Sequence, residues 1–320
     1  MRLYAYHDRF GDERFGVLVA GRLLTGAALE KRGRLPAPTT HLGIGYAIEF
    51  EDDWQHGLWR ATSRALGHGA SLLDPASRRP APPIPSPGKV VCAGLNYGAH
   101  VAEGERVKPE APVLFAKFAN AVIGDGDPIV RPEGTSALDL EVELGVVIGR
   151  RAQRVSVDEA MACVAGYVVV NDVSARDWQG IPVALKPGAK GDGQWLRAKG
   201  SDTFLPMGPV FATRDEVDPK AGLRLRSWRI TPDGTEHLMQ DGDTSDLLFD
   251  VPALIAHISR SITLEPGDVI ATGTPAGVGV YHDPPVFLEP GDRVRCEIEG
   301  IGSVENPVVD WSDLALTAPA

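Results

Sequence analysis

The sequence predicts an α+β protein rich in β-strands, with a small N-terminal α+β domain followed by a larger second domain. Short apolar or alternating runs typical of strands recur along the chain, while helical spacing is confined to a few segments. A proline-rich stretch at residues 79–88 suits neither a helix nor a central strand, so it is expected to link the two parts. The 320 residues, 43% of them hydrophobic and 23% charged, suffice for one large domain or two, and residues 313–320 are expected to form a tail.

Composition argues against several classes of protein. The formal net charge of −11 would repel polyanions, so we expect no nucleic-acid partner. No apolar run approaches the roughly 18 residues of a membrane span, and the first residues lack the apolar core of a signal peptide. We therefore expect no membrane association and a cytoplasmic location. Cys92, Cys163 and Cys296 are widely spaced among apolar residues, which indicates buried thiols rather than disulfides or a cysteine-based metal site.

Residues 1–78 form the expected N-terminal domain. Alternating apolar residues at 15–19 followed by Ala20-Gly21 predict a β-hairpin. Apolar residues recur at helical spacing between residues 51 and 66, which predicts a helix. The histidines of this region are scattered, so it offers no candidate site.

A histidine and a glutamate follow the first strand of the larger domain. Residues 89–94 are predicted to form a short apolar strand, and if the next segment is helical, His100 and Glu103 face one another three residues apart. A carboxylate beside a histidine orients the ring and suits it to activate water as a general base. The alternative is an ordinary pair on a helix surface, worth only a few tenths of a kcal/mol.

Three carboxylates alternate along a strand predicted at residues 138–144. Asp139, Glu141 and Glu143 would share one face of this strand, with apolar residues on the other. Like charges in a partly apolar setting repel one another unless they are protonated or neutralised by a cation. The segment alone is equally compatible with a solvated strand face and with a cation site.

Two more charged residues belong to apolar strands. The continuous apolar run at 167–171 predicts a buried strand that ends on Asp172, and a carboxylate in that position needs a partner. Lys117 lies in the apolar run at 113–118. It is either an edge residue with its ammonium group in water or a buried cation directed at an anion.

The remaining patterns predict architecture without chemistry. Ser156 and Glu159 are spaced as a capping box for a short helix that runs to residue 164. The pentapeptide Leu-Glu-Pro-Gly-Asp occurs at 264–268 and again at 288–292, where Pro-Gly suits a turn that leads into a strand.

A glycine-rich stretch at 273–279 does not make a nucleotide site. It lacks the lysine and hydroxyl ending of a phosphate loop and the glycine spacing of a dinucleotide-binding turn. The nucleophile elbow of serine hydrolases and the His-Glu-x-x-His motif of zinc proteases do not occur either.

Five sequence blocks carry a resemblance to a known family. They occur in the family's order between residue 89 and about residue 310, and through them the chain resembles the fumarylacetoacetate hydrolase family. The blocks are Gly94-Leu95-Asn96-Tyr97 with His100 and Glu103, Leu138 to Leu144, Asn171 to Gln179, Lys199 to Pro209, and Gly273 to Gly279.

The resemblance implies a fold and a cofactor. Residues 89–312 would form a catalytic domain of mixed β-roll architecture, usually found as a homodimer. Glu141, Glu143 and Asp172 would bind Mg²⁺ or Mn²⁺, for which Ca²⁺ could substitute. Carboxylate ligands suit these hard cations, whereas zinc more often recruits histidine or cysteine. Asp139 is not a ligand in the family pattern, so we expect it to support the site.

The resemblance also implies residues that act on the substrate. His100 and Glu103 match the family's water-activating pair, and Lys199 is implied as a third catalytic residue. Substrate contacts are implied at four positions, Gln179, Thr274, Lys117 and Gln240.

The implied activity is hydrolysis of a carbon-carbon bond in a 2-oxo acid or β-diketone, such as an acylpyruvate or a dioxo sugar acid. The cation would stabilise an enolate, and the histidine would activate water. Because the same enolate serves other reactions, the alternatives are a decarboxylase, an isomerase or a hydratase of 2-oxo or 2-hydroxydienoic acids. A cation-binding protein without catalytic activity is a further alternative. The connection at residues 180–198 is longer than usual in the family and could reshape the pocket.

Overall fold

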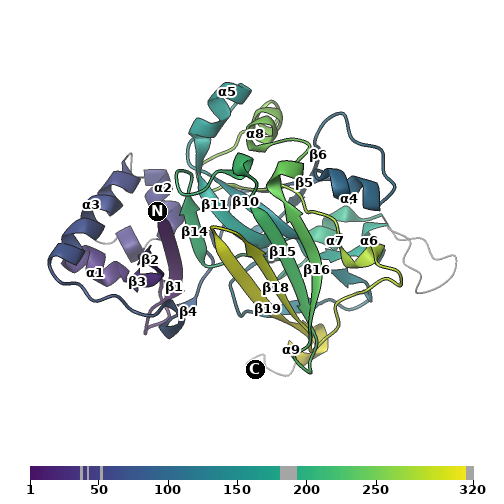
Figure 1. Cartoon of the computed structure of the whole chain (residues 1–320), viewed down its shortest axis with the longest axis horizontal. Helices are drawn as coiled ribbons and strands as arrows, with labels where there is room; N and C mark the ends of the chain where they lie inside the picture. Colours follow the sequence, from purple (N-terminus) through teal and green to yellow (C-terminus); the bar gives the residue numbers. More distant parts are fainter. Residues whose placement is uncertain (37–38, 42, 51–52, 181–192, 315–320) are drawn as a thin grey trace.

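The computed structural model describes residues 1–36, 39–41, 43–50, 53–180 and 193–314. As predicted, the fold is α+β and rich in strands, and Figure 1 shows two main sheets with helices around them.

The larger sheet has ten strands and crosses the whole molecule. Its order is β3 (Arg22–Leu24), β2 (Glu13–Val19), β1 (Arg2–His7), β14 (Val210–Thr213), β11 (Val164–Asn171), β10 (Val142–Ile148), β17 (Val269–Ala271), β5 (Val90–Gly94) and β6 (Val113–Lys117), with β4 (Arg79–Pro80) paired to β1. Strands β17 and β5 are parallel, and the other described neighbours are antiparallel. Every residue of β10 and β11 is buried, as expected for a central pair covered on both faces.

A five-stranded sheet packs against this central pair. Its order is β16 (Glu236–Asp243), β15 (Arg224–Ile230), β18 (Arg293–Ile298), β19 (Gly302–Asp310) and β8 (Ile129–Arg131). Strand β15 contacts β10 and β18 contacts β11, so the core lies between the two sheets (Figure 1). Two short ladders complete the strands, β9 (Leu138–Asp139) with β12 (Ser174–Ala175) and β7 (Val122–Ile123) with β13 (Leu205–Pro206).

The helices are short and lie around the sheets. They are α1 (Gly26–Lys31), α2 (Gly43–Phe50), α3 (Trp54–Gly67), α4 (Gly98–Glu103), α5 (Val157–Ala160), α6 (Arg176–Gln179), α7 (Trp195–Gly200), α8 (Val251–Ser259) and α9 (Trp311–Leu314). The predicted helix near residues 51–66 is confirmed as α3, which buries Trp54, Leu58, Ala61 and Ala65. In the part of the chain that the structure describes, no helix has the length and apolar character needed to cross a membrane.

The N-terminal segment continues the large sheet. The predicted hairpin is confirmed as β2 and β3, and its turn residues Ala20 and Gly21 both have positive φ, 49° and 75°, as in the tight turns that suit hairpin twist. Strand β1 pairs with β14, with Leu3 opposite Phe211. The sheet therefore crosses the predicted boundary at residues 79–88, and one continuous core contains residues from both sides of it.

Local patterns explain several element ends. The Ser156–Glu159 capping box is present. Helix α5 ends at Ala160, a 3-10 helix continues it over Met161–Cys163, and the helical segment ends there because Val164 already pairs with Ile148 in β11. The two Pro-Gly turns lead into β17 and β18 as predicted. In each, the aspartate accepts a hydrogen bond from the backbone of the preceding glutamate, Asp268 from Glu265 and Asp292 from Glu289.

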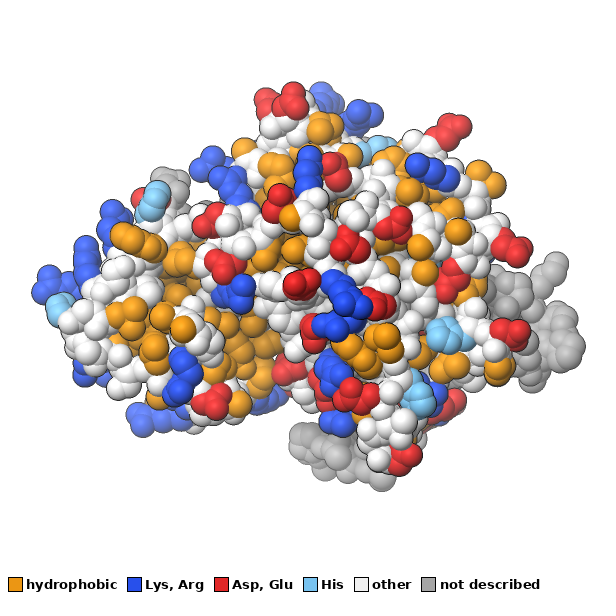
Figure 2. Space-filling view, viewed as in Figure 1, with side chains coloured by type: hydrophobic (Ala, Val, Ile, Leu, Met, Phe, Trp, Pro, Cys, Tyr) orange, Lys and Arg blue, Asp and Glu red, His pale blue; other side chains and the backbone are white. Residues whose placement is uncertain are grey.

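The outer face of the five-stranded sheet carries a row of exposed ion pairs, here called the surface ladder. In Figure 2, acidic and basic side chains are mixed over this region of the surface. The pairs are Arg224–Asp241, Arg226–Glu297, Arg293–Glu305 and Arg295–Glu236.

Candidate active site

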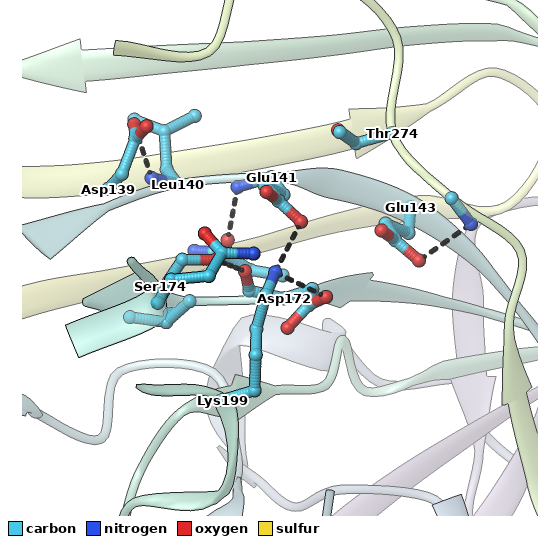
Figure 3. Close-up of polar contacts among 12 residues, drawn as sticks. Asp139, Leu140, Glu141, Glu143, Asp172, Ser174, Lys199 and Thr274 are labelled. Carbon is cyan, nitrogen blue, oxygen red and sulfur yellow. Dashed lines mark hydrogen bonds and ion pairs between the residues drawn. The ribbon is translucent and has the colours of Figure 1, made fainter. Parts of the chain in front are cut away.

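The acidic segment does not form the single continuous strand predicted for residues 138–144. The strand is interrupted at Leu140-Glu141, because side chains there bind the backbone donors. Asp139 Oδ1 accepts from the backbone of Leu140, and Asn171 Oδ1 accepts from the backbone of Glu141, both at 2.9 Å. The interruption directs Asp139 away from the two glutamates that follow it (Figure 3).

Strands β10 and β11 bring three carboxylates together. Glu143 lies opposite Val170 in their ladder, and the backbone of Asp172, just after β11, donates to the carbonyl of Glu141 at 2.9 Å. Glu141, Glu143 and Asp172 are all buried, and each offers an oxygen atom within 4.8 Å of those of the other two. We call these three residues the carboxylate cluster.

Two buried cations contact the carboxylate cluster. Lys199 Nζ donates to Glu141 Oε2 and to Asp172 Oδ2, each at 2.8 Å, and Figure 3 shows its side chain reaching between them. Arg176 Nη1 lies 2.7 Å from Glu141 Oε1. Glu143 has no ion pair with a described residue and accepts a single hydrogen bond, from the backbone of Gly273 at 2.8 Å.

The buried charges of the site do not balance. Four buried carboxylates face three buried cations: Asp139, Glu141, Glu143 and Asp172 against Lys117, Arg176 and Lys199. Burial raises the pKa of Glu143 well above its ordinary value, and the charges of Asp172 and Glu141 raise it further. For Glu141, burial also acts to raise the pKa, but Lys199 and Arg176 outweigh it and the pKa is lowered. Glu143 is thus the carboxylate of the cluster whose negative charge is least compensated by the described residues.

A divalent cation fits this donor set. Asp172 is buried and forms two ion pairs, with Lys117 Nζ 2.7 Å from its Oδ1 and with Lys199 Nζ 2.8 Å from its Oδ2. Glu143, by contrast, has no ion pair with a described residue. Carboxylate oxygens without nitrogen or sulfur donors are the ligands that Mg²⁺ and Mn²⁺ prefer. The carboxylate cluster could therefore hold such an ion, which would offset its excess charge.

The predicted pair of His100 and Glu103 is formed on α4. His100 Nδ1 lies 3.3 Å from Glu103 Oε2, and Glu103 Oε1 accepts from the backbone of Gly277 at 2.8 Å, so the glutamate is itself held in place. The imidazole ring of His100 packs 5.8 Å from that of Tyr281, measured between ring centres. Its Nε2 atom has no hydrogen-bond partner among the described residues, which leaves it free to exchange a proton with a ligand.

A cavity of about 260 Å³ joins the histidine to the carboxylate cluster. Its polar or charged lining residues are His100, Arg106, Glu141, Glu143, Arg176, Gln179, Lys199, Thr274 and Tyr281. Its apolar wall includes Leu95, Phe115 and Trp195. The volume lies just below the range of about 300–1,000 Å³ typical of small-molecule sites, which indicates a small ligand.

Two of the residues implied for substrate binding line this cavity. Gln179 Oε1 accepts from Arg176 Nη1 at 3.0 Å, which orients its amide. The hydroxyl group of Thr274 donates to the carbonyl of Val142 at 3.0 Å and accepts from Gln240 Nε2 at 2.7 Å. Both side chains are therefore positioned by neighbours before any substrate arrives.

The other two implied substrate contacts, Lys117 and Gln240, are buried and are not among the residues that line the cavity, so their contact with a substrate stays a prediction. The ammonium group of Lys117 is fully enclosed and donates to the carbonyl oxygens of Val173, Lys199 and Phe204 at 3.0, 2.5 and 2.7 Å. Gln240 donates to Thr274 Oγ1 and accepts from the backbone of Val142 at 2.9 Å. In this structure both side chains hold backbone and side-chain groups of the site in place. These contacts were not predicted, because local sequence cannot show which backbone groups a buried polar side chain will meet.

Arg176 is a site residue that lies within the block Asn171 to Gln179 but that no pattern in the sequence marked as functional. Its Nε donates to Asp139 Oδ2 at 2.8 Å, and it contacts Glu141 and Gln179 as described above. Asp139 also accepts from the backbone of Gly279 and Val280, at 2.8 and 3.1 Å. Asp139 is thus saturated by donors and is not part of the carboxylate cluster, in line with its expected supporting role. The only signal for Arg176 was its place four residues after Asp172 in a strand-to-helix connection.

Other residues of the cavity had no signal in the sequence. Arg106 and Tyr281 are nearly 180 residues apart in the chain, and no pattern links them to the blocks. Most of the long connection at 180–198 falls at residues 181–192, outside the described residues, so its predicted effect on the pocket stays a prediction.

Comparisons with known proteins agree with this geometry. Residues 89–309 match the family model described as fumarylacetoacetate (FAA) hydrolase C-terminal. The chain is 42% identical over 261 residues to the oxaloacetate tautomerase fahd2, mitochondrial, of Xenopus laevis, which covers 82% of this chain and 77% of that protein. It is 44% identical over 227 residues to the oxaloacetate tautomerase FAHD2A, mitochondrial, of Homo sapiens, which covers 71% of this chain and 68% of that protein.

These names overturn one expectation. The cytoplasmic location expected from the sequence is contradicted, because the similar curated proteins from frog, human and cattle are named mitochondrial. The expectation rested on the absence of an apolar signal core, and that pattern does not test for import into an organelle.

Solved structures share the fold over nearly the whole chain. A fumarylacetoacetate hydrolase from Exiguobacterium antarcticum superposes with a TM-score of 0.78 at 33% identity, covering 97% of this chain and 99% of that one. The 2-hydroxyhepta-2,4-diene-1,7-dioate isomerase from Mycobacterium marinum gives a TM-score of 0.66 at 34% identity, with the same coverage. The family match, the identities and the shared fold confirm the resemblance found in the sequence, and the chain belongs to the fumarylacetoacetate hydrolase family.

Proposed function

We propose that this protein is a divalent-metal-dependent enzyme that interconverts the keto and enol forms of a small 2-oxo acid, with oxaloacetate as the first substrate to test. The observation that carries the proposal is a single small cavity that joins an under-neutralised carboxylate cluster to a histidine with a free Nε2 atom. The names of the similar proteins, oxaloacetate tautomerase and dienedioate isomerase, support an isomerase over the hydrolase expected from the sequence.

The polar end of the cavity suits the head of a 2-oxo acid. Its carboxylate and adjacent carbonyl oxygen are a bidentate oxygen donor of the kind that hard cations accept. A metal ion held by Glu141, Glu143 and Asp172 would supply a Lewis acid that favours the enolate form of such a substrate. Lys199 stays protonated, because burial lowers its pKa but Asp172 and Glu141 raise it more strongly. Its positive charge and that of Arg176 add to the attraction for an anion.

His100 is the residue placed to move the proton. Keto–enol conversion transfers one proton from the carbon next to the carbonyl to the carbonyl oxygen, or the reverse. His100 Nε2 can accept the proton from carbon in one direction and return it in the other, while Glu103 holds the ring and stabilises its charged form. Thr274 and Gln179 offer polar groups to the substrate oxygens from the cavity wall.

Hydrolysis of a carbon-carbon bond is the second candidate, and one observation favours it. The same pair of His100 and Glu103 could activate water toward the second carbonyl of a β-diketone acid, as expected from the sequence. Hydrolysis would need space for a water molecule and for a long acyl chain, and tautomerisation does not. The small cavity, of about 260 Å³, therefore favours tautomerisation over hydrolysis.

The test is a kinetic assay with enol oxaloacetate in the presence of Mg²⁺ or Mn²⁺, followed by the loss of enol absorbance. We expect the wild-type protein to accelerate ketonisation well beyond metal alone and a chelator to remove the effect. His100→Ala should lower the rate by about 10²- to 10⁴-fold, whereas His56→Ala, at an exposed histidine of α3, should not.

Parallel assays for pyruvate release from oxaloacetate and for cleavage of an acylpyruvate distinguish the alternatives. Acylpyruvate cleavage without ketonisation would replace the proposal with the hydrolase. Metal binding without any of these reactions would leave a cation-binding protein without catalytic activity.

A further inference from the structure

An arginine at the exposed side of the cavity has no partner in the described part of the molecule. Arg106 lines the cavity, its side chain is exposed, and its guanidinium group forms no ion pair or hydrogen bond with any described residue. In a chain with a formal net charge of −11, many exposed arginines find a carboxylate, as those of the surface ladder do. An unpaired guanidinium facing a substrate cavity is available to a ligand.

The other cations of the cavity are already engaged. Lys199 is bound to Glu141 and Asp172, and Arg176 is bound to Asp139 and Glu141, both deep in the site. Among the described lining residues, Arg106 is the cation that no carboxylate neutralises. The wall made by Leu95, Phe115 and Trp195 offers no charge to a substrate's second anionic group.

The backbone fixes Arg106 relative to His100. The backbone of Arg106 donates to the carbonyl of Val101 at 2.9 Å, so Arg106 is tied to the helix α4 that carries His100. Between them, Gly104 allows close approach: a methyl group built there would lie 2.8 Å from Tyr281 Oη and 3.3 Å from Arg106 Cγ. The Arg106 stem and the Tyr281 ring therefore flank the same glycine beside the proton-transfer residue.

We infer that Arg106 determines substrate specificity by binding a second carboxylate at the far end of the substrate, so that the enzyme prefers 2-oxo dicarboxylic acids to monocarboxylic ones. The inference rests on the proposed function, because that function places the 2-oxo acid head at the carboxylate cluster. The small cavity then places the distal carboxylate of a short diacid toward its exposed side, where a planar guanidinium can bind it through two hydrogen bonds.

The test compares oxaloacetate with its 4-methyl ester, which keeps the reacting atoms and loses the distal charge. Arg106→Gln should raise KM for oxaloacetate by about ten- to a hundredfold with little change in kcat, and should leave the ester unaffected. Arg106→Lys should restore part of the preference. Lys108→Gln, at an exposed cation two residues along that does not line the cavity, is the matched control and should behave as wild type. Equal losses for diacid and ester, or no loss for either, would overturn the inference.

Binding measurements separate this inference from the proposed function. In the Mn²⁺-loaded protein, oxalate has the chelating head without a distal group, and malate has both. Arg106→Gln should weaken malate binding and leave oxalate binding unchanged, whether or not oxaloacetate is turned over. If the wild type binds both ligands with this contrast but does not ketonise oxaloacetate, the proposed function fails and the role of Arg106 stands. If ketonisation occurs and the contrast is missing, the role of Arg106 is wrong.

Discussion

Two charge-rich networks lie on the sheets of this protein, and they differ in balance. The surface ladder pairs each of its arginines with a carboxylate on another strand of the same sheet, and its side chains are 25–53% exposed. The site network is almost completely enclosed, and its four carboxylates exceed its three cations. Strand segments with alternating charge can therefore give a solvated face or a cation site.

The comparison shows that a buried charge needs a specific partner, whereas an exposed charge does not. Exposed ion pairs contribute little, because water and salt screen them and ordering two long side chains costs entropy. A buried charge has no water to stabilise it, so each site residue has specific donors or acceptors. The Glu143 carboxylate is the exception, because it lies within the carboxylate cluster and has no ion pair with a described residue, and this is the strongest structural argument for a bound cation.

Replacing one arginine in each network should give the largest difference between them in the loss of stability. Arg176→Gln removes the ion-pair partner of buried Asp139 and one of the two cations paired with Glu141, and we expect a loss of about 3–5 kcal/mol in the free energy of unfolding. Arg226→Gln in the surface ladder should cost at most about 1 kcal/mol, because its pair with Glu297 is about one-third exposed. Urea denaturation of the chelator-treated protein measures both values.

Equal losses for the two variants would remove the distinction between the networks. High salt provides a further check on the same proteins. High salt should reduce the difference in free energy of unfolding between the wild type and Arg226→Gln. It should have little effect on the difference between the wild type and Arg176→Gln, since buried pairs are screened much less.

A smaller effect is expected on the binding of a proton by Glu143. In the metal-free protein, burial together with Asp172 and Glu141 raises the pKa of Glu143 above its ordinary value of 4.5, so this carboxyl holds a proton at pH values where a free one would not. Its protonated form favours the folded state below pH 4.5, and that stabilisation is lost as the pH rises toward the raised pKa. A divalent cation replaces the proton, so the gain in Tm from Mn²⁺ should grow with pH above 4.5.

Calorimetry of Mn²⁺ binding in two buffers with different ionisation enthalpies measures the released proton directly. We expect release of up to about one proton per chain at pH values between 4.5 and the raised pKa. Glu143→Gln cannot carry that proton, so it should abolish the release, and a full proton released by this variant would contradict the assignment.

Much of the site could be predicted from the sequence. The family blocks identified the carboxylate cluster, the pair of His100 and Glu103, and Lys199, and the structure brings all of them to one cavity or its edge. Short-range patterns predicted the hairpin, the α3 helix and the capping box, because spacing of 2 or 3.6 residues and capping are local properties.

The remaining features depend on contacts between distant segments. Lys117 meets carbonyl oxygens from residues 56 to 87 positions later in the chain. Strand β1 pairs with β14 across about 200 residues, so its extension of the large sheet had no local signal. The interruption at Leu140-Glu141 arises because Asn171 binds a backbone donor, and an amide at the end of another strand cannot be recognised as its partner from spacing.

The most direct test of the cation site is a calorimetric titration of chelator-treated protein with Mn²⁺. We predict one strong site per chain in the wild type and in Glu236→Gln, which alters only the surface ladder. Glu143→Gln removes the ligand with the most unbalanced charge, and we predict that it weakens binding by at least about a hundredfold, or about 2.7 kcal/mol. Wild-type affinity in Glu143→Gln, or no Mn²⁺ binding by the wild type, would contradict the account.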